Sequence, residues 1–136
     1  MRRAYVDANV IVRLITNDPE DMADCAARLF EQVDEGALEL VIDGIVLAET
    51  VWVLSSFYGF SAHEIAPGLA TLLTNDGIVS EDKTELLQAL ALYDKKNIDF
   101  VDALVAVRML KRGISEVYSF DRHFDRLQSI SRIQPN

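Results

Sequence analysis

Short β-prone apolar runs alternate with longer segments of helical periodicity along this chain, and that order restricts its fold more than any other feature. The β-prone runs are residues 4–6, 38–42, 78–79, 116–120 and 130–134. Neighbouring parallel strands need long crossover connections, which the intervening helical segments provide. We therefore expect an α/β fold of three layers, α/β/α, with helices on both faces of a mostly parallel sheet of four to five strands.

Helix boundaries follow from capping residues. Asp18 is the expected N-cap of a helix that has Pro19 at its first position and ends at Gly36. Residues 44–57 form an apolar helix, and Ser61 with Glu64 has the spacing of a capping box for the next one. The last long helix is expected over residues 100–112, with Gly113 as its stop signal.

Length and composition indicate a single domain over residues 1–136. The chain has 136 residues, half of them apolar, and no repeat or Pro/Gly/Ser-rich linker divides it. Its one cysteine, Cys25, forms no internal disulfide, so a reducing cytoplasm is the expected location. The opening segment, residues 1–21, is too polar for a signal peptide or a membrane span, and no membrane association is expected.

The charge is acidic overall and unevenly distributed. The formal net charge of −9 argues against an unspecific nucleic-acid binder. Residues 1–82 hold 4 Lys+Arg and 15 Asp+Glu, whereas residues 83–136 hold 9 and 7. Part of the surface is therefore available to a polyanion, while solvated acidic helices explain the negative half.

Asp7 and Asp121 stand where an early and a late predicted strand end. The carboxyl ends of parallel strands meet at one edge of a sheet, which is where open α/β sheets bind ligands. These two aspartates are thus expected to be neighbours. The simpler alternative for each is an aspartate that caps a helix or a turn.

Glu49, Asp99 and Asp102 accompany strongly apolar helical segments. Glu49 has no Lys or Arg within a helical turn, so its side chain either extends to water at the helix edge or faces a bound cation. We expect at least part of it to be desolvated. A structural role is sufficient to explain Asp99 and Asp102: as the N-cap and the third helical residue, they complement the free N–H groups of the first turn. Asp102 should nevertheless lie beside the apolar stripe of the helix.

Carboxylates that converge on one cleft repel one another unless a cation lies among them. Ligation by oxygen alone, without His or Cys, favours Mg²⁺ or Mn²⁺ over zinc. Such ions polarise phosphoryl oxygens and lower the pKa of bound water, so the chemistry indicated is phosphodiester hydrolysis.

Four motifs in this order closely resemble the PIN-domain ribonucleases, and among them the VapC-type toxins of prokaryotic toxin–antitoxin pairs. The motifs are Tyr-Val-Asp7-Ala-Asn9, Leu-Ala-Glu49-Thr, Asp99-Phe-Val-Asp102-Ala-Leu, and Ser119-Phe-Asp121-Arg-His-Phe. The likeness covers essentially the whole chain. Ala8 stands where the family commonly has Thr, a departure that removes no ligand.

The resemblance implies a role for individual residues. Asp7, Glu49, Asp102 and Asp121 match the acidic quartet that holds Mg²⁺ or Mn²⁺ and carries catalysis. Three residues match supporting positions: Asn9, Asp99 and Ser119. The implied reaction is endonucleolytic cleavage of RNA by a metal-activated water, leaving a 5′-phosphate and a 3′-hydroxyl.

The resemblance also implies partners. They are the RNA substrate, a small antitoxin protein and a second copy of the chain in a homodimer. The cations available for the RNA backbone include Arg13, Lys95, Lys96 and Arg122. His63 and His123 are expected to be ordinary surface residues, and Trp52 and Phe57 to pack in a core or a dimer face.

Three other functions deserve comparison. A PIN-fold module that binds RNA or protein without nuclease activity would be expected to lack Asp7 or Asp121. A phosphoryl-transfer receiver domain needs a lysine at the end of a late strand, where this chain has Ser119 and Asp121. A flap-type DNA nuclease needs a helical arch, for which the chain is short.

Overall fold

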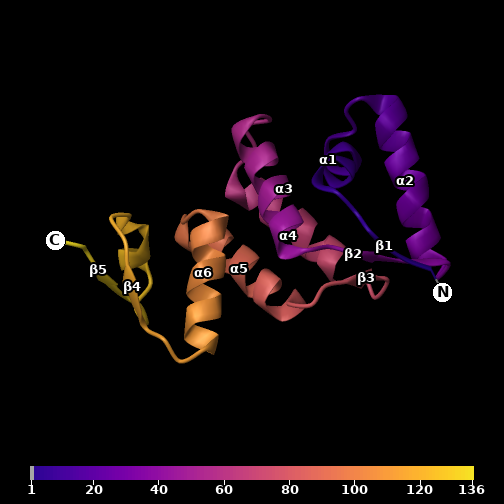
Figure 1. The fold of residues 1–136 in the computed structure, drawn as a ribbon. Helices are drawn as coiled ribbons and strands as arrows, with labels where there is room; N and C mark the ends of the chain where they lie inside the picture. The colour runs from indigo at the N-terminus through magenta and orange to yellow at the C-terminus, as the bar shows by residue number, and fades with distance from the viewer. Residues whose placement is uncertain (1) are drawn as a thin grey trace. The chain divides into compact units, whose positions relative to one another are not determined.

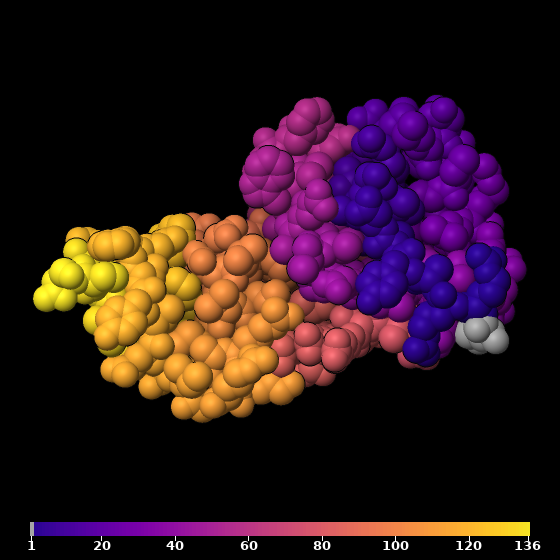
Figure 2. All heavy atoms as spheres, in the orientation of Figure 1, coloured from indigo at the N-terminus to yellow at the C-terminus, as the bar shows by residue number. Residues whose placement is uncertain are grey.

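The computed structural model describes residues 2–136 as six α-helices, five β-strands and one 3₁₀ helix (Figure 1). The chain divides into two compact units, Met1–Lys83 and Thr84–Asn136. That boundary lies one residue from the point where the charge balance of the sequence changes. Side chains fill the spaces between the ribbons within each unit (Figure 2). A single domain over residues 1–136 stays a prediction.

The N-terminal unit contains a parallel three-stranded sheet. Its strands are β1 (Arg2–Tyr5), β2 (Leu38–Val41) and β3 (Ile78–Val79), in the order β1-β2-β3. In register, Ala4 lies opposite Leu40, and Leu40 lies opposite Ile78. Leu40 and Ile78 are both fully buried, so the central strand anchors the core of this unit.

Four helices complete the N-terminal unit: α1 (Ala8–Thr16), α2 (Glu20–Asp34), α3 (Gly44–Ser56) and α4 (Ala62–Leu73). Helix α1 packs against both α2 and α3. The predicted capping box is present, because the Ser61 hydroxyl accepts from the Glu64 amide and the Glu64 carboxylate accepts from the Ser61 amide. Asp18 as an N-cap was wrong: Pro19 occupies that position, and the Asp18 carboxylate accepts a hydrogen bond from the Tyr58 hydroxyl.

The C-terminal part holds α5 (Lys83–Lys96), α6 (Phe100–Lys111), β4 (Glu116–Tyr118), the 3₁₀ helix η1 (Arg122–Arg126) and β5 (Ser131–Ile133). The buried Glu85 carboxylate on α5 pairs with Arg108 Nε at 3.2 Å and Lys111 Nζ at 2.7 Å on α6. Helix α6 ends before Gly113, whose φ of +75° suits glycine. Strands β4 and β5 pair in parallel.

The α/β class and the parallel pairing of strands are confirmed. All five expected strands form, and they pair as a sheet of three in one unit and a sheet of two in the other. Within residues 2–136, no helix is both long and apolar enough to cross a membrane.

Helix α3 is apolar on nearly every side, yet only one side of it is buried. Leu47, Val51 and Leu54 lie in the core, whereas Trp52 is 65% exposed. Phe57, just after the helix, is 78% exposed. Packing of Trp52 and Phe57 in the core of this chain was therefore wrong, and their place in a dimer face stays a prediction.

Gly77 precedes β3 at a point where the chain has no room for a side chain. A Cβ there would lie 2.4 Å from Val33 Cγ1 and 3.2 Å from the Val33 carbonyl oxygen, and Val33 is buried. We expect Gly77→Ala to lower the free energy of unfolding by about 1–3 kcal/mol, as overpacking does. Urea unfolding followed by circular dichroism measures this.

The matched control is Gly68→Ala in the exposed part of α4. A Cβ at Gly68 meets nothing within 4 Å. The higher helix propensity of alanine should therefore raise the free energy of unfolding of this variant by about 0.5–1 kcal/mol. Equal stabilities of the two variants would contradict the packing described around β3.

Candidate metal centre

Asp102 lies in the first turn of α6. Asp99 occupies the N-cap position of this helix, as predicted, but its side chain makes no capping hydrogen bond. Asp102 is the third residue of the helix and is half-buried beside Ala103 and Leu104, which are buried. The start of α6 thus directs a carboxylate to the margin of an apolar core.

Asp121 lies in the short loop between β4 and η1. Its backbone N–H donates to the Ser119 hydroxyl at 2.9 Å, and its Oδ1 accepts from the backbone N–H of His123 at 2.9 Å. The alternative interpretation of Asp121 as a capping aspartate is therefore correct, since it caps η1. The cap fixes the direction of the carboxylate without neutralising it.

Arg132 on β5 forms hydrogen bonds to residues at both ends of this loop. Its Nη1 donates to the Ser119 carbonyl at 3.0 Å, and its Nε and Nη2 donate to the two Asp125 oxygens at 3.0 and 3.3 Å. The Arg132 side chain is 12% exposed and the Asp125 side chain is 53% exposed, so this bidentate pair is open to water on its carboxylate side. One arginine thus ties together both sides of the loop that carries Asp121.

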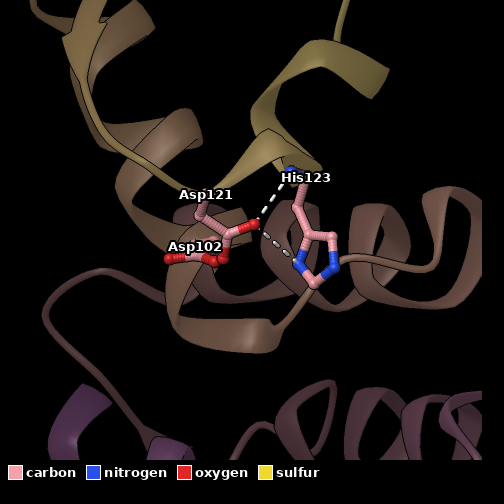
Figure 3. A group of neighbouring side chains, drawn as sticks. All are labelled: Asp102, Asp121 and His123. Carbon is pink, nitrogen blue, oxygen red and sulfur yellow. Dashed lines mark hydrogen bonds and ion pairs between the residues drawn. The ribbon is translucent and has the colours of Figure 1, made fainter. Parts of the chain in front are cut away.

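Asp102, Asp121 and His123 converge, although they come from α6, the loop and η1 (Figure 3). One ligand atom from each lies within 4.8 Å of the others. The structure therefore brings together two of the four predicted metal ligands, Asp102 and Asp121. It adds one group that the sequence analysis did not expect, the imidazole of His123.

The two carboxylates have opposite electrostatic environments. Burial, a hydrogen bond with Asp121 and the negative charges of Asp121 and Asp99 raise the pKa of Asp102 to about 6. The hydrogen bond from the His123 amide is the main reason why the pKa of Asp121 lies below its ordinary value. Below about pH 6 a protonated Asp102 donates to an ionised Asp121, and above it the two negative charges repel each other.

Asp7 and Glu49 belong to the N-terminal unit. Asp7 ends β1 and caps α1, with its Oδ1 accepting from the Ala8 amide at 2.8 Å, so its interpretation as a helix cap is correct. That Asp7 and Glu49 bind one ion together with Asp102 and Asp121 stays a prediction.

Of the two alternatives for Glu49, the structure agrees with a side chain that extends to water at the helix edge, and a bound cation facing it stays a prediction. Its side chain is exposed on α3, on the same face as Ile45 and Trp52, which are also exposed. The apolar composition of the helix suggested burial on all sides, whereas one face of it lies in water.

The other predicted residues are distributed over both units. Asn9 and Arg13 line a groove of about 530 Å³ between α1 and α2, together with Met22, Cys25 and Leu29. Three further predicted cations are exposed: Lys95 and Lys96 at the end of α5, and Arg122 in η1. Contacts between these residues and RNA stay a prediction.

Sequence reasoning missed two residues of this centre. His123 was expected to be an ordinary surface residue, but its Nδ1 atom is buried and has no hydrogen-bond partner among residues 2–136. Its position two residues after a capping aspartate was the signal, because a cap brings that residue back toward the carboxylate. Arg132 gave no local signal, since its partners Ser119 and Asp125 come from other segments.

The donor set suits a divalent cation. Two carboxylates at close range, one of them with a pKa raised by burial and by the charge of the other, are stabilised by a positive ion between them. The buried Nδ1 of His123 is a further donor: it forms no hydrogen bond within residues 2–136 and lies 3.3 Å from Asp121 Oδ1, with which it pairs only when the ring is protonated. Carboxylate oxygen ligands fit Mg²⁺ or Mn²⁺, and the imidazole nitrogen is compatible with Mn²⁺.

Comparison with known proteins identifies a family. The sequence matches the PIN domain family over residues 4–130, a span that includes residues of both units. It is also 28% identical over 122 residues to a protein named VapC ribonuclease from Aquifex aeolicus (strain VF5). That alignment covers 90% of each chain.

Replacing Asp102 by asparagine should stabilise the metal-free protein at neutral pH. The raised pKa of about 6 means that the folded state binds a proton more tightly than the unfolded state. The ionised carboxylate then destabilises the fold increasingly as the pH rises from about 4 to 6. Because the group is partly solvated, we expect Asp102→Asn to raise the free energy of unfolding by on the order of 1 kcal/mol at pH 7 and to change it little at pH 4.

Urea unfolding in EDTA at both pH values measures this difference. Asp24→Asn on the exposed side of α2 is the matched control, since it removes the same charge outside the pair. An equal gain in both variants, or no gain for Asp102→Asn at pH 7, would contradict the repulsion described for the pair.

Proposed function

This chain belongs to the PIN domain family, and from that premise we propose that it is a Mg²⁺- or Mn²⁺-dependent endoribonuclease, the toxin of a toxin–antitoxin pair. The observation that carries the proposal is the Asp102–Asp121 pair, two carboxylates that need a positive charge between them. The similarity to a VapC ribonuclease supports RNA as the substrate.

Each acid has a proposed role. Asp102 and Asp121 hold the ion, and Asp7 and Glu49 complete its ligand set. Ser119 positions Asp121 through the hydrogen bond to its amide, and Asp99 adds negative charge beside Asp102. A divalent ion supplies Lewis-acid polarisation of the phosphodiester and lowers the pKa of the attacking water.

RNA must approach a strongly acidic chain, so its phosphates need cations. Arg13, Lys95, Lys96 and Arg122 are the proposed contacts, and Asn9 orders the loop after Asp7. None of these four cations has an ion-pair partner within residues 2–136, so their charges are available to phosphates. Binding through phosphates makes the affinity fall steeply with salt concentration.

The proposed protein partners are a small antitoxin and a second copy of this chain. Ile45, Trp52 and Phe57 give the N-terminal unit exposed apolar side chains that a partner would cover. The toxin function follows from the same similarity as the substrate.

A PIN-fold module that binds RNA or protein without cutting RNA is the second candidate. It would not need two carboxylates held in contact at a cost in stability. The pairing of Asp102 with Asp121 therefore favours the nuclease.

We expect the purified protein to cleave single-stranded RNA in Mg²⁺ or Mn²⁺ and to be inactive in EDTA. Asp121→Asn and Asp7→Asn should each lower the cleavage rate by at least about 100-fold, a loss typical of a removed metal ligand. A fluorophore–quencher RNA gives the rate, and circular dichroism checks that each variant is folded.

Asp24→Asn, an exposed charge on α2, should cleave at the wild-type rate. Cleavage that persists in EDTA, or in both Asp121→Asn and Asp7→Asn, would exclude the metal mechanism. A folded wild-type protein that binds RNA and never cuts it would favour the binding module.

The toxin role has a separate test in cells. Induced expression of the wild-type chain should arrest bacterial growth, and expression of Asp121→Asn should not. Co-expression of a small open reading frame next to its gene should restore growth. Arrest that is equally strong with Asp121→Asn would show that toxicity does not depend on the nuclease.

A further inference from the structure

The buried ring nitrogen of His123 forms no hydrogen bond within residues 2–136, and it pairs with the Asp121 carboxylate only when the ring is protonated. We propose that His123 Nδ1 is a direct nitrogen ligand of the divalent ion and that it makes the centre prefer Mn²⁺ over Mg²⁺. This inference rests on the proposed function, since it assigns a ligand to the same ion.

The first observation is the state of Nδ1 itself. Nδ1 is buried, and it neither accepts nor donates a hydrogen bond within residues 2–136. A buried polar atom without a partner costs about 1–3 kcal/mol, so native structures rarely leave one. A ligand that occupies the nitrogen lone pair removes that cost.

The second observation is how close the ring lies to a carboxylate. Nδ1 lies 3.3 Å from Asp121 Oδ1, an ion pair only when the ring is protonated, and the two atoms form no hydrogen bond. A neutral ring nitrogen and a carboxylate oxygen are both acceptors, so a cation that both of them bind would stabilise them at this separation.

The distances agree with a single ion. Around an octahedral ion with bonds of about 2.1 Å, neighbouring ligands lie about 3.0 Å apart and opposite ligands about 4.2 Å apart. The Nδ1–Oδ1 distance is 3.3 Å, and all three donors lie within 4.8 Å of one another. The Nδ1–Oδ1 distance is thus close to that of neighbouring ligands of one ion.

The backbone holds the imidazole in this place. The His123 amide donates to the same Asp121 oxygen that faces the ring, as Figure 3 shows. Phe124, the next residue, is buried and anchors η1 in the core of the C-terminal unit. The ring is thus fixed beside Asp121, while the His123 side chain remains 42% exposed, which leaves its other edge open to water.

A nitrogen ligand changes which ion is preferred. Mg²⁺ is a hard ion that binds oxygen and gains little from imidazole, whereas Mn²⁺ accepts nitrogen and oxygen ligands. If carboxylates were the only protein ligands, the site would have similar affinities for Mg²⁺ and Mn²⁺. His123 therefore sets the selectivity, and the acids set the overall affinity.

Electron spin-echo measurements on the Mn²⁺-loaded protein test direct ligation, because a coordinated imidazole gives a nitrogen modulation. We expect a ¹⁴N signal from the wild type and its replacement by a ¹⁵N signal after labelling with ¹⁵N-histidine. The chain has two histidines, so His63→Asn is the matched control and should keep the signal. His123→Asn should lose it.

Calorimetry with each ion measures the selectivity. In His123→Asn the Mn²⁺ affinity should fall about tenfold, since one ligand is lost, while the Mg²⁺ affinity changes less than about threefold. Equal losses for both ions would overturn the proposed selectivity. The labelled wild type needs no substitution, so a poorly folded variant does not affect the test of ligation.

The outcomes separate this inference from the proposed function. Mn²⁺ that binds in an Asp121-dependent manner without a nitrogen signal overturns the role of His123 and leaves the nuclease intact. RNA cleavage in EDTA by a protein that binds no Mn²⁺ overturns both. A ¹⁴N signal that persists in His123→Asn also overturns the assignment.

Discussion

The repulsion between the Asp102 and Asp121 carboxylates is the constraint on which the functional interpretation depends. A fold selected for stability alone would separate two acids or pair each with a cation. Here burial, the contact with Asp121 and the negative charges of Asp121 and Asp99 raise the pKa of Asp102 to about 6. The arrangement is unfavourable without a positive charge between them, and a divalent ion provides that charge.

Ordinary secondary-structure chemistry produces this arrangement. The N-terminus of α6 places Asp102 on its first turn, and the cap of η1 orients Asp121. Ser119 and Arg132 then hold the loop between β4 and η1, with Arg132 reaching it from β5. Each of these contacts is common in proteins, and only their combination brings two carboxylates and an imidazole to one place.

Much of the architecture could be predicted from local sequence. Periodicity located the strands and most of the helices, although it did not predict α1. The capping box at Ser61 was confirmed because it depends on residues three positions apart. The two alternatives for Glu49 stayed open because an apolar helix does not reveal which of its faces meets water. His123 and Arg132 were missed because their roles depend on residues brought together by tertiary folding. The family resemblance, which uses the order of motifs along the whole chain, was confirmed.

The most direct test of the central claim is the ionisation of Asp102 itself, followed by ¹³C NMR of its labelled carboxyl carbon during a pH titration. In metal-free protein the carboxyl should titrate near pH 6, because of burial and the charge of Asp121. Saturating Mg²⁺ should move that titration below the ordinary aspartate pKa of about 3.9, since the ion replaces the proton. A titration that Mg²⁺ leaves unchanged would contradict the account.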